Sequence, residues 1–367
     1  MSYNLRLSLI TALLIFAPAV FVPTAWGDDS PVFATIEASL ATEGDQIRQL
    51  AFDGDADTMF VSAGNVGQDD HFTLALDKPV KLRSLTVTTG RADGSDGLKS
   101  GTVQVSDDGQ AFERLASFAE GVAESKDSQR QVLAIRIAPG ADSPHPLVIR
   151  ELTLDSEPPV AIFQYPVEFI VDVSDAPEMK EWAEKAAATC QRAYPMINEE
   201  LKADGYKPPR LVAMDLKSDY QGVAATGGNH IVGSVKFFKE HPDDVGAMVH
   251  ETAHVVQNYR GRRNPGWLVE GVADYVRFFK FEPGNLGLID ARRAHYDGSY
   301  RVSAAFLAFL VEKYDKEIVR KLNQLLRAGE YREGTFKELT GKSLDELDDE
   351  WRATLSPANR EQPAKSM

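Results

Sequence analysis

The sequence predicts a multidomain protein, with an all-β sandwich followed by an α+β domain in which helices dominate. As far as about Glu157, short β-rich runs alternate with Gly and Asp turns, a spacing typical of a β-sandwich. Beyond that point a strand is followed mostly by helical patterns. The chain has 367 residues, 43% of them hydrophobic and 26% charged, which is enough for two hydrophobic cores.

The first 27 residues predict a secretory signal peptide. Arg6 precedes a mostly apolar run over 9–22, and Ala25-Trp26-Gly27 places small residues on both sides of Trp26. The run is shorter than the roughly 18 residues that span a bilayer. An uncleaved anchor is the alternative. We therefore expect a secreted or periplasmic protein with no transmembrane segment in the mature chain.

The chain is acidic and contains a single cysteine. Forty Lys and Arg against 55 Asp and Glu give a net charge of −15, which repels phosphate backbones and anionic lipid surfaces. Nucleic acid is therefore not expected as a partner. Cys190 cannot form an intrachain disulfide, and its helical surroundings predict a small buried residue. Any zinc site must then use histidines and carboxylates.

A proline-bearing break at 156–159 separates the predicted domains, because consecutive prolines exclude helix. Before the break, strands are expected at 72–76, 84–89, 102–105, 132–137 and 147–154. After it, we expect strands at 167–173, 211–214 and 231–237, and a long helix over about 177–203. The predicted division is a signal peptide over 1–27, a sandwich over 28–156, a linker over 157–162, a second domain over 163–355 and a polar tail over 356–367.

The strongest functional signal is His250-Glu251-Thr252-Ala253-His254. On a helix, residues four apart share one face, so the two imidazoles can converge on one metal ion with the carboxylate beside them. Asp243 and Asp244 offer N-terminal caps, and Gly261 offers a stop. A shuffled sequence of this composition contains the motif only ~0.01 times. A buried histidine pair without metal is the alternative.

A catalytic zinc ion usually has three protein ligands and one position for water. No histidine follows His254 before His295, which excludes the metzincin pattern. Glu270 is the candidate third ligand, on a helix that opens near Pro265. Asp274, one turn later, can accept the free ring N–H of a ligating histidine. The alternatives are a solvated carboxylate at Glu270 and a surface ion pair at Asp274.

Three further predictions concern the chemistry at this site. Glu251 would act as general base, taking a proton from water and delivering it to the leaving amine. Tyr300 is the first candidate for stabilising the oxyanion and His295 the second, although a tyrosine before an apolar helix can simply pack. The segment 227–234 predicts a Gly-rich turn and an edge strand that could pair with an extended peptide; its glycines could instead relieve strain.

These motifs resemble the basic secretory protein family of plants and bacteria, which is assigned to the zinc peptidases and is related in pattern to gluzincins. The resemblance spans about 167–355 and rests on the histidine motif, on Pro-Gly-Trp-Leu-Val-Glu-Gly-Val-Ala-Asp-Tyr-Val-Arg at 265–277, and on a third block at 297–307. It implies a zincin-like metallopeptidase domain with Zn²⁺ at His250, His254 and Glu270 and with Glu251 catalytic. The chain departs from the family in being acidic, so partners inferred from a basic surface are not expected.

The predicted sandwich resembles the discoidin, or coagulation factor 5/8 C-terminal type, domain. The resemblance covers about 31–156 and rests on Leu-Ala-Phe-Asp-Gly-Asp-Ala-Asp-Thr at 50–58 and on the segments 72–80 and 85–87. It implies a jelly-roll, galactose-binding-like fold, a glycan- or surface-binding role and a structural calcium ion near the Asp-Gly-Asp turn. Asp53, Asp55 and Asp57 supply oxygen ligands that suit Ca²⁺. An ordinary turn without metal is the alternative.

Together these observations favour a secreted zinc peptidase that acts on peptides or proteins and carries a glycan- or surface-binding module. The alternative is an inactive surface- or carbohydrate-binding protein that retains a peptidase fold. The intact histidine motif with Glu270 favours the enzyme, because a domain retained only for its shape has no chemical need for Glu251.

Overall fold

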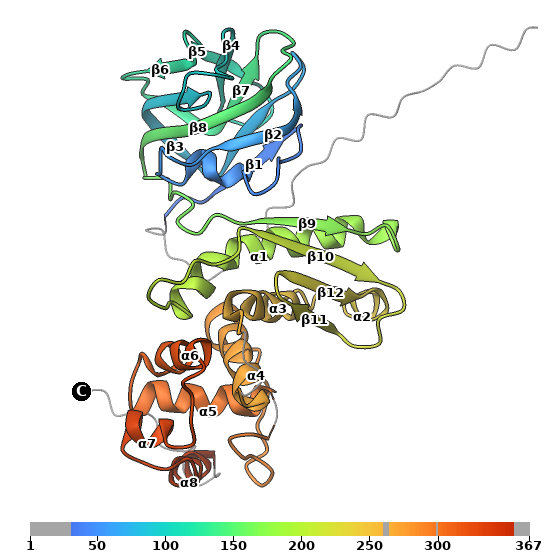
Figure 1. The fold of residues 1–367 in the computed structure, drawn as a ribbon, viewed down its shortest axis with the longest axis vertical. Helices are drawn as coiled ribbons and strands as arrows, with labels where there is room; N and C mark the ends of the chain where they lie inside the picture. The colour runs from blue at the N-terminus through green and yellow to red at the C-terminus, as the bar shows by residue number, and fades with distance from the viewer. Residues whose placement is uncertain (1–30, 260–263, 299, 356–367) are drawn as a thin grey trace, which may run out of the picture.

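The computed structural model describes residues 31–259, 264–298 and 300–355, drawn in colour in Figure 1. The predicted signal peptide over 1–27, the predicted helix stop at Gly261 and the predicted polar tail over 356–367 lie outside these residues. Along the longest axis, the β-sandwich comes first, then a small sheet with helices, then a group of helices (Figure 1). Within the described ranges, no helix is both long and apolar enough to cross a membrane.

The first domain is an antiparallel β-sandwich, which confirms the predicted class. Its strands follow the order β2-β8-β3-β7-β4-β5, and β1 and β6 also pair with β3. A short helix, η1 (Arg48–Phe52), precedes β2. The strands are β1 (Ala34–Ala38), β2 (Phe60–Asn65), β3 (Phe72–Thr89), β4 (Gly101–Ser106), β5 (Glu113–Ser117), β6 (Val122–Ser125), β7 (Arg130–Pro139) and β8 (Pro146–Glu157).

Strand β3 joins two strands that the sequence predicts separately, at 72–76 and 84–89. The chain continues through Asp77-Lys78-Pro79, and the register with β7 shifts between Ala75 and Val80. The first part of β3 therefore pairs with β1 and β7, and the last part with β6 and β8. A long strand with such an irregularity can serve both sheets of a sandwich. The turn-like residues at 77–79 are thus accommodated inside a strand.

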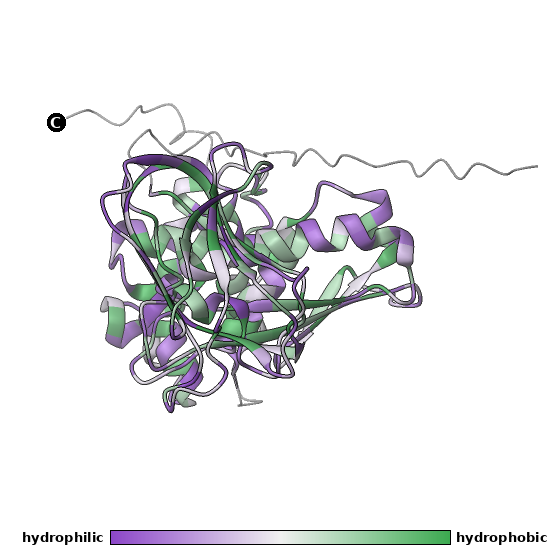
Figure 2. Cartoon of the chain, turned by 90° about the horizontal axis from the view of Figure 1, so that it is seen from above, coloured by the Kyte–Doolittle hydropathy of each residue, from purple (hydrophilic) through white to green (hydrophobic). Residues whose placement is uncertain are grey.

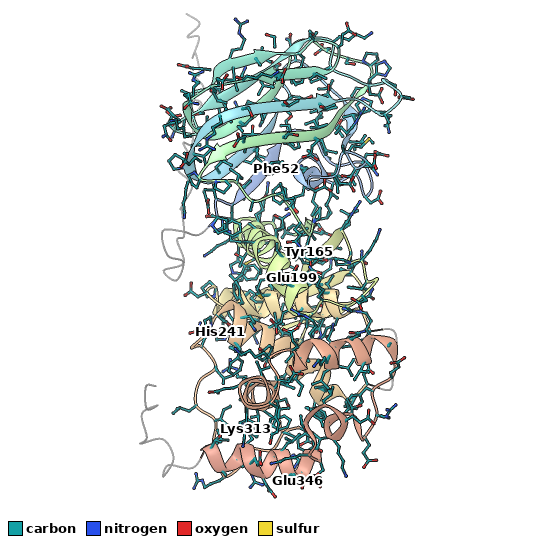
Figure 3. All side chains as sticks on the ribbon, turned by 90° about the vertical axis from the view of Figure 1, so that its left-hand side faces the viewer. Phe52, Tyr165, Glu199, His241, Lys313 and Glu346 are labelled. Atoms are coloured by element: carbon teal, nitrogen blue, oxygen red, sulfur yellow. The ribbon has the colours of Figure 1, made fainter. Side chains whose placement is uncertain are left out.

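The segment predicted as a linker packs against the sandwich. Ala161 N–H donates to the Val32 carbonyl over 2.9 Å, and Phe163 N–H donates to the Phe52 carbonyl over 3.0 Å. The rings of Phe52 and Phe163 meet edge to face with centroids 6.1 Å apart. Figure 3 shows Phe52 at the side of the sandwich that faces the second domain. These contacts tie the connection to the first domain.

Glu168, the first residue of β9, joins the two domains. Its carboxylate is buried and accepts hydrogen bonds from the Thr42 hydroxyl and from the Arg48 guanidinium, with which it also forms an ion pair. The neighbouring Val167 N–H donates to Gln49 Oε1 over 2.8 Å. A buried charge is tolerated only when paired and hydrogen-bonded, and here the first domain supplies the partners.

The second domain contains a four-stranded sheet of order β11-β12-β10-β9. Strands β9, β10 and β12 are parallel, and β11 is antiparallel to β12. Helices outnumber strands here, as the sequence predicts. The elements are β9 (Glu168–Asp172), η2 (Pro177–Met179), α1 (Lys180–Glu200), β10 (Leu211–Lys217), β11 (Ala224–Gly227), β12 (His230–Ser234), α2 (Val235–Glu240), α3 (Gly246–Gln257), α4 (Gly266–Tyr275), the π-helical η3 (Val276–Phe281), α5 (Tyr300–Lys313), α6 (Ile318–Ala328), α7 (Thr335–Thr340) and α8 (Leu344–Leu355).

Two predictions near β12 are wrong in detail. The strand expected over 231–237 ends at Ser234, whose hydroxyl accepts the Phe237 N–H over 3.3 Å and caps α2. Strand β12 is also not the edge of the sheet, because it lies between β10 and β11. The edge strand on this side of the sheet is β11, with β9 at the other edge, and β11 is joined to β12 through a turn in which Gly228 has a φ of +66°. The glycines indicate the turn, but local sequence does not indicate which of the two strands lies at the edge of the sheet.

Helix α1 packs against α3. Its buried face is rich in small side chains, which let neighbouring elements approach closely: Ala183, Ala186, Ala187, Cys190 and Ala193. Cys190 is fully buried, as expected, and burial raises the pKa of its thiol to about 12. In the hydropathy view of Figure 2, hydrophilic and hydrophobic residues alternate along the helices.

Candidate metal centre

Helix α3 carries the histidine motif through the core of the second domain. Almost all of its side chains are buried, so its position is set by packing rather than by helix propensity. Of the two predicted caps, Asp244 accepts a bond from Ala247 N–H over 3.3 Å. The helix ends at Asn258, which has a φ of +41° and returns its N–H to the His254 carbonyl. The motif is therefore held on a rigid, buried element.

Helix α4 brings the predicted third ligand back to α3. His250 Nε2 and His254 Nε2 lie 3.0 Å apart, and Glu270 Oε2 lies 3.2 Å from the first and 3.1 Å from the second. Among the described residues, this is the only group of three or more His, Cys, Asp or Glu whose donor atoms all lie within 4.8 Å of one another. The three residues that the sequence proposes as ligands therefore converge.

The size and chemistry of this triangle fit a zinc ion. Tetrahedral ligands at 2.0–2.2 Å from zinc lie roughly 3.3–3.6 Å apart, within a few tenths of an ångström of the separations found here. Two imidazole nitrogens and one carboxylate oxygen are also donors that zinc prefers. Glu270 is the most exposed of the three side chains, at 32%, so the group is partly accessible to solvent at this residue.

Two buried side chains hold the outer nitrogens of the imidazoles. Asp274 Oδ1 lies 2.6 Å from His250 Nδ1, as the spacing on α4 predicts. Gln257 Oε1 lies 2.7 Å from His254 Nδ1. Gln257 is not among the residues predicted from the sequence, although its position three residues after His254 on the same helix is a signal for such a contact. Both partners leave the Nε2 atoms directed at the shared site.

Hydrogen bonds within the group change the pKa values of His250 and Glu270. Burial lowers the pKa of His250, but the hydrogen bonds to Asp274 and Glu270 outweigh burial and raise the pKa to about 9. For Glu270, burial raises the pKa, and the two imidazoles outweigh it and lower the pKa to about 2. The two carboxylates thus stabilise positive charge on the His250 ring.

Glu251 lies beside the group without joining it. Its side chain is buried, and its Oε2 accepts a hydrogen bond from the Thr226 hydroxyl over 2.8 Å. Thr226 belongs to β11, the edge strand of the sheet, and its hydroxyl also lies 3.0 Å from the Glu251 carbonyl. The Glu251 carboxylate therefore lies between the three candidate metal ligands and the edge strand β11. Nothing in the local sequence indicates Thr226, because it lies 25 residues away.

Tyr300, the first residue of α5, lies beside the trio. Its ring centroid is 6.0 Å from that of His250, and its side chain is half exposed. The close packing of α4 and α5 places it there: a Cβ on Gly271 would lie 2.8 Å from the Ser303 Cβ. The charge of Glu270, followed by burial, raises the pKa of Tyr300, which keeps its hydroxyl a donor.

His295 lies in different surroundings. Its Nδ1 pairs with Asp297, its Nε2 faces Asp348 at 3.8 Å, and its ring contacts Tyr296 with centroids 4.4 Å apart. These contacts of His295 are with the segment just before α5 and with α8. The structure therefore places Tyr300, the first candidate, beside the three candidate ligands, whereas the exposed His295 pairs with Asp297 and Asp348.

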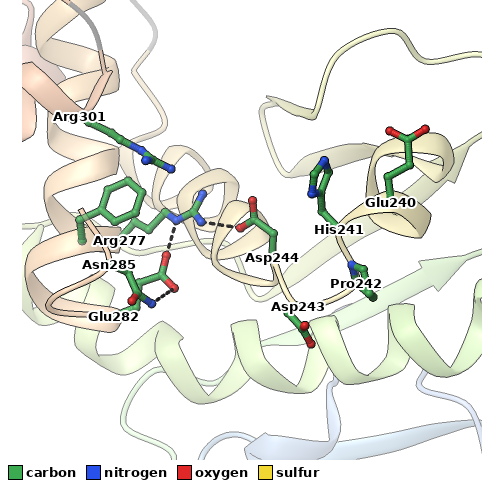
Figure 4. Close-up of a pocket in the computed structure, with 10 residues that line it drawn as sticks. Glu240, His241, Pro242, Asp243, Asp244, Arg277, Glu282, Asn285 and Arg301 are labelled. Carbon is green, nitrogen blue, oxygen red and sulfur yellow. Dashed lines mark hydrogen bonds and ion pairs between the residues drawn. The ribbon is translucent and has the colours of Figure 1, made fainter. Parts of the chain in front are cut away.

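The structure also tests the alternative that Asp274 forms a surface ion pair, for which Arg277 is the nearby cation. Arg277 forms ion pairs with Asp244 and Glu282 instead, at the start of α3 (Figure 4). These residues line a polar pocket of about 390 Å³, to which Arg301 also contributes. None of the three candidate ligands lines this pocket. Asp274 therefore remains available to His250.

The Asp53 loop has a different geometry. Asp53 accepts hydrogen bonds from the Thr58 hydroxyl and from Asp55 N–H, and Asp55 accepts one from Asp57 N–H. The three aspartate side chains do not form a converging group of the kind found at the histidines. A fourth carboxylate, Glu151 on β8, lies nearby, and its Oε2 atom is buried without a hydrogen-bond partner. Burial, and then the charge of Asp53, raise its pKa to about 7.

Comparison with known proteins agrees with both resemblances. The family described as peptidase of plants and bacteria matches residues 168–351, and the F5/8 type C domain matches residues 35–141. The chain is thus a multidomain protein in which a discoidin-type sandwich precedes a peptidase-family domain. It belongs to the peptidase family of plants and bacteria.

Solved structures similar to this chain include several carbohydrate-binding modules. CBM32-1 from a family 31 glycoside hydrolase of Clostridium perfringens is 20% identical over 33% of this chain and 92% of that chain, with a TM-score of 0.30. The family 32 module of Clostridium perfringens NanJ, solved with galactose, is 19% identical over 33% and 92%, with a TM-score of 0.29. Chitosan-binding module 1 of a Paenibacillus sp. IK-5 chitosanase/glucanase is 20% identical over 33% and 93%, with a TM-score of 0.27. No curated protein matches the chain.

Proposed function

We propose that the chain is a zinc-dependent peptidase in which His250, His254 and Glu270 hold the metal. The observation that supports this most is the convergence of three electron-pair donors, 3.0–3.2 Å apart, with both outer imidazole nitrogens engaged elsewhere. Two imidazole nitrogens and a carboxylate oxygen at these separations form a donor set that suits zinc. Bound zinc would supply a Lewis acid that makes water nucleophilic near neutral pH and polarises the scissile carbonyl.

Glu251 serves as the general base in this proposal. It takes a proton from the attacking water and passes it to the leaving amine. The Thr226 hydroxyl holds the carboxylate in position without neutralising it, because a hydroxyl donates a hydrogen bond and keeps its proton. Tyr300 donates to the oxyanion that develops on the substrate carbonyl. Its exposed position at the start of α5 leaves it free to meet the substrate.

The substrate is an extended peptide that pairs with β11. This strand is the edge of the sheet, so its outward backbone groups are available for an added strand. Thr226, on this strand, contacts the base. The scissile bond of a peptide bound along β11 would therefore lie near Glu251.

The sandwich is proposed to bind a glycan or a cell-surface ligand, with a calcium ion at the Asp53 loop. Asp53, Asp55 and Asp57 surround the turn, and Glu151 adds a buried oxygen without a partner. Oxygen donors of this kind suit Ca²⁺. We propose the division already predicted, with the sandwich over 28–156, a connection over 157–162 and the peptidase domain over 163–355.

Export is the remaining part of the proposal. The apolar run before Ala25-Trp26-Gly27 supports removal of residues 1–27 and a secreted or periplasmic mature protein. N-terminal sequencing of protein recovered outside the cytoplasm checks this. An N-terminus after Gly27 is expected, and an intact Met1 would contradict it.

The second candidate function is a surface- or carbohydrate-binding protein that keeps an inactive peptidase fold. The sandwich favours it, since such a module needs no chemistry in the second domain. The substitution Glu251→Gln in the full chain separates the two. We expect unchanged zinc content by elemental analysis and a loss of peptide-library hydrolysis of about 10²–10⁴-fold. Glu181→Gln, an exposed glutamate on α1, is the matched control. Wild-type protein without zinc, or a fully active Glu251→Gln variant, would reject the assignment.

A further inference from the structure

We propose that Gln257 is a positioning residue that fixes the tautomer of His254 and links this ligand to the helix that carries Glu270. The proposal rests on the proposed zinc site and deepens it. Gln257 is the last residue of α3, and its side chain is 1% exposed. Its two polar atoms reach in different directions. Oε1 lies 2.7 Å from His254 Nδ1, and Nε2 donates to the Val269 carbonyl over 2.9 Å.

The orientation of the amide follows from its surroundings. The Val269 carbonyl can only accept a hydrogen bond, so the NH₂ group of Gln257 must face it. The amide oxygen is then the atom that faces His254, and it can only accept. His254 Nδ1 must therefore carry its proton. A neutral imidazole has one N–H, so His254 Nε2 presents its lone pair to the metal position.

The same side chain also ties the ligands together. Val269 directly precedes Glu270, so the amide connects the ring of the second ligand to the backbone beside the third. Buried amides with both groups satisfied are costly to disturb, because a lost partner leaves a buried polar atom unpaired.

The partner of His254 differs from that of His250 in charge. Asp274 is a carboxylate and stabilises positive charge on the His250 ring, whereas Gln257 is neutral. Asp274, Glu251 and Glu270 already place three acidic side chains around the two histidines. A neutral acceptor at position 257 orients the second ring without adding a fourth buried negative charge.

The test uses zinc alone and the full chain. Gln257→Met keeps the length and volume of the side chain but removes its acceptor and donor groups. We expect its zinc dissociation constant, measured by competition with a chromophoric chelator, to rise roughly 10–100-fold. Asn198→Leu is the matched control. It removes another buried helix amide, which donates to the Tyr194 carbonyl and contacts none of the three ligands. This control should keep wild-type zinc affinity.

Gln257→Glu separates orientation from general packing. Its carboxylate keeps an acceptor for His254 Nδ1 and loses the donor to Val269. We expect zinc affinity within about 3-fold of wild type, together with a lower melting temperature. In ¹⁵N-histidine NMR of metal-free protein at alkaline pH, His254 should carry its proton on Nδ1 in the wild type and lose that preference in Gln257→Met.

The outcomes distinguish this proposal from the proposed function. A wild type that binds zinc, with Gln257→Met binding it equally well, overturns the role of Gln257 and leaves the zinc site standing. Equal losses in Gln257→Met and Asn198→Leu also overturn it, because they indicate general destabilisation. A wild type that binds no zinc rejects the site itself. If Gln257→Met does not fold, the zinc affinity of Gln257→Glu decides, and a loss beyond 10-fold contradicts the proposal.

Discussion

Two regions of the molecule gather metal-ligating side chains, and they do so in opposite ways. At the Asp53 loop three aspartates lie within five residues, yet Asp53 and Asp55 are occupied with the N–H and hydroxyl groups of their own turn. At the histidine site the candidate ligands come from α3 and α4, and their donor atoms lie 3.0–3.2 Å apart. Proximity along the chain therefore does not produce convergence, and two packed helices do.

We expect the largest effect when Glu270, the candidate ligand on α4, is removed. Glu270→Ala should weaken zinc binding more than about 100-fold, beyond the loss expected for an outer hydrogen-bond partner, because one of the three donors is gone. Zinc competition titration measures the change. Asp57→Ala in the loop is the control and should leave zinc affinity unchanged. Retained tight binding in Glu270→Ala would show that another side chain fills the third position.

A smaller effect is expected at the strand edge. Thr226→Val removes the hydroxyl that contacts Glu251 and keeps the shape of the side chain. We expect kcat to fall about 10-fold, or ~1.4 kcal/mol, with KM and zinc content little changed. Thr226→Ser should restore most of the activity. A change confined to KM would indicate that Thr226 contacts the substrate and does not position the base.

The stability of the sandwich should depend on pH through Glu151, the buried carboxylate near the Asp53 loop. The pKa of Glu151 rises to about 7 from its usual 4.5, so the folded state binds more protons than the unfolded state between these values. The free energy of unfolding of the sandwich should therefore fall as pH rises through this window, by about 1 kcal/mol after allowance for solvent screening. Urea unfolding of wild type and Glu151→Gln at pH 4.5 and 8 measures this.

Added Ca²⁺ sharpens the same measurement. If the loop holds calcium, the cation should offset the charge of Glu151 and remove the pH dependence in the wild type. Glu151→Gln should show little pH dependence with or without calcium. An unchanged wild-type profile at millimolar Ca²⁺ would contradict the calcium proposal and leave the turn interpretation.

A second stability measurement compares two aspartates of the loop, of which Asp57 should show the smallest effect. Asp53→Ala removes an acceptor for Thr58 and Asp55 and should cost about 1–2 kcal/mol of unfolding free energy. Asp57→Ala removes an exposed carboxylate and should cost less than about 0.5 kcal/mol. Denaturant unfolding in metal-free buffer compares the two variants. Equal costs would show that the hydrogen bonds of Asp53 contribute no stability.

Local sequence patterns predict the helices and strands of this protein better than they predict which of these elements pack together. The strand alternation indicates the sandwich, and the spacing of His250 and His254 indicates a helix face, because both depend on periods of two and 3.6 residues. The bend inside β3 and the outward position of β11 are not visible locally. Strand order depends on which partner buries each edge, and such partners lie far apart in the chain.

The site shows the same limit residue by residue. Asp274 could be predicted because a ligating histidine needs an acceptor and α4 offers one a turn beyond Glu270. Gln257 had a weak signal in its i+3 spacing from His254. Thr226 and Glu151 had none, since each reaches its site from a separate strand. A hydrogen bond across a fold is a product of packing, and its spacing in sequence is arbitrary.

The sequence by itself determined the chemistry available to this protein: two histidines and a glutamate on one helix, acidic residues on the next, and two cores of different class. Only the tertiary structure decided which of these groups meet. Close packing of α3, α4 and α5 brings Glu270, Asp274 and Tyr300 to the two imidazoles, whereas the aspartates of the Asp53 loop remain engaged with their own backbone. The reason is physical, because periodicity acts over one or two turns, and convergence requires burial of surfaces that no single segment contains.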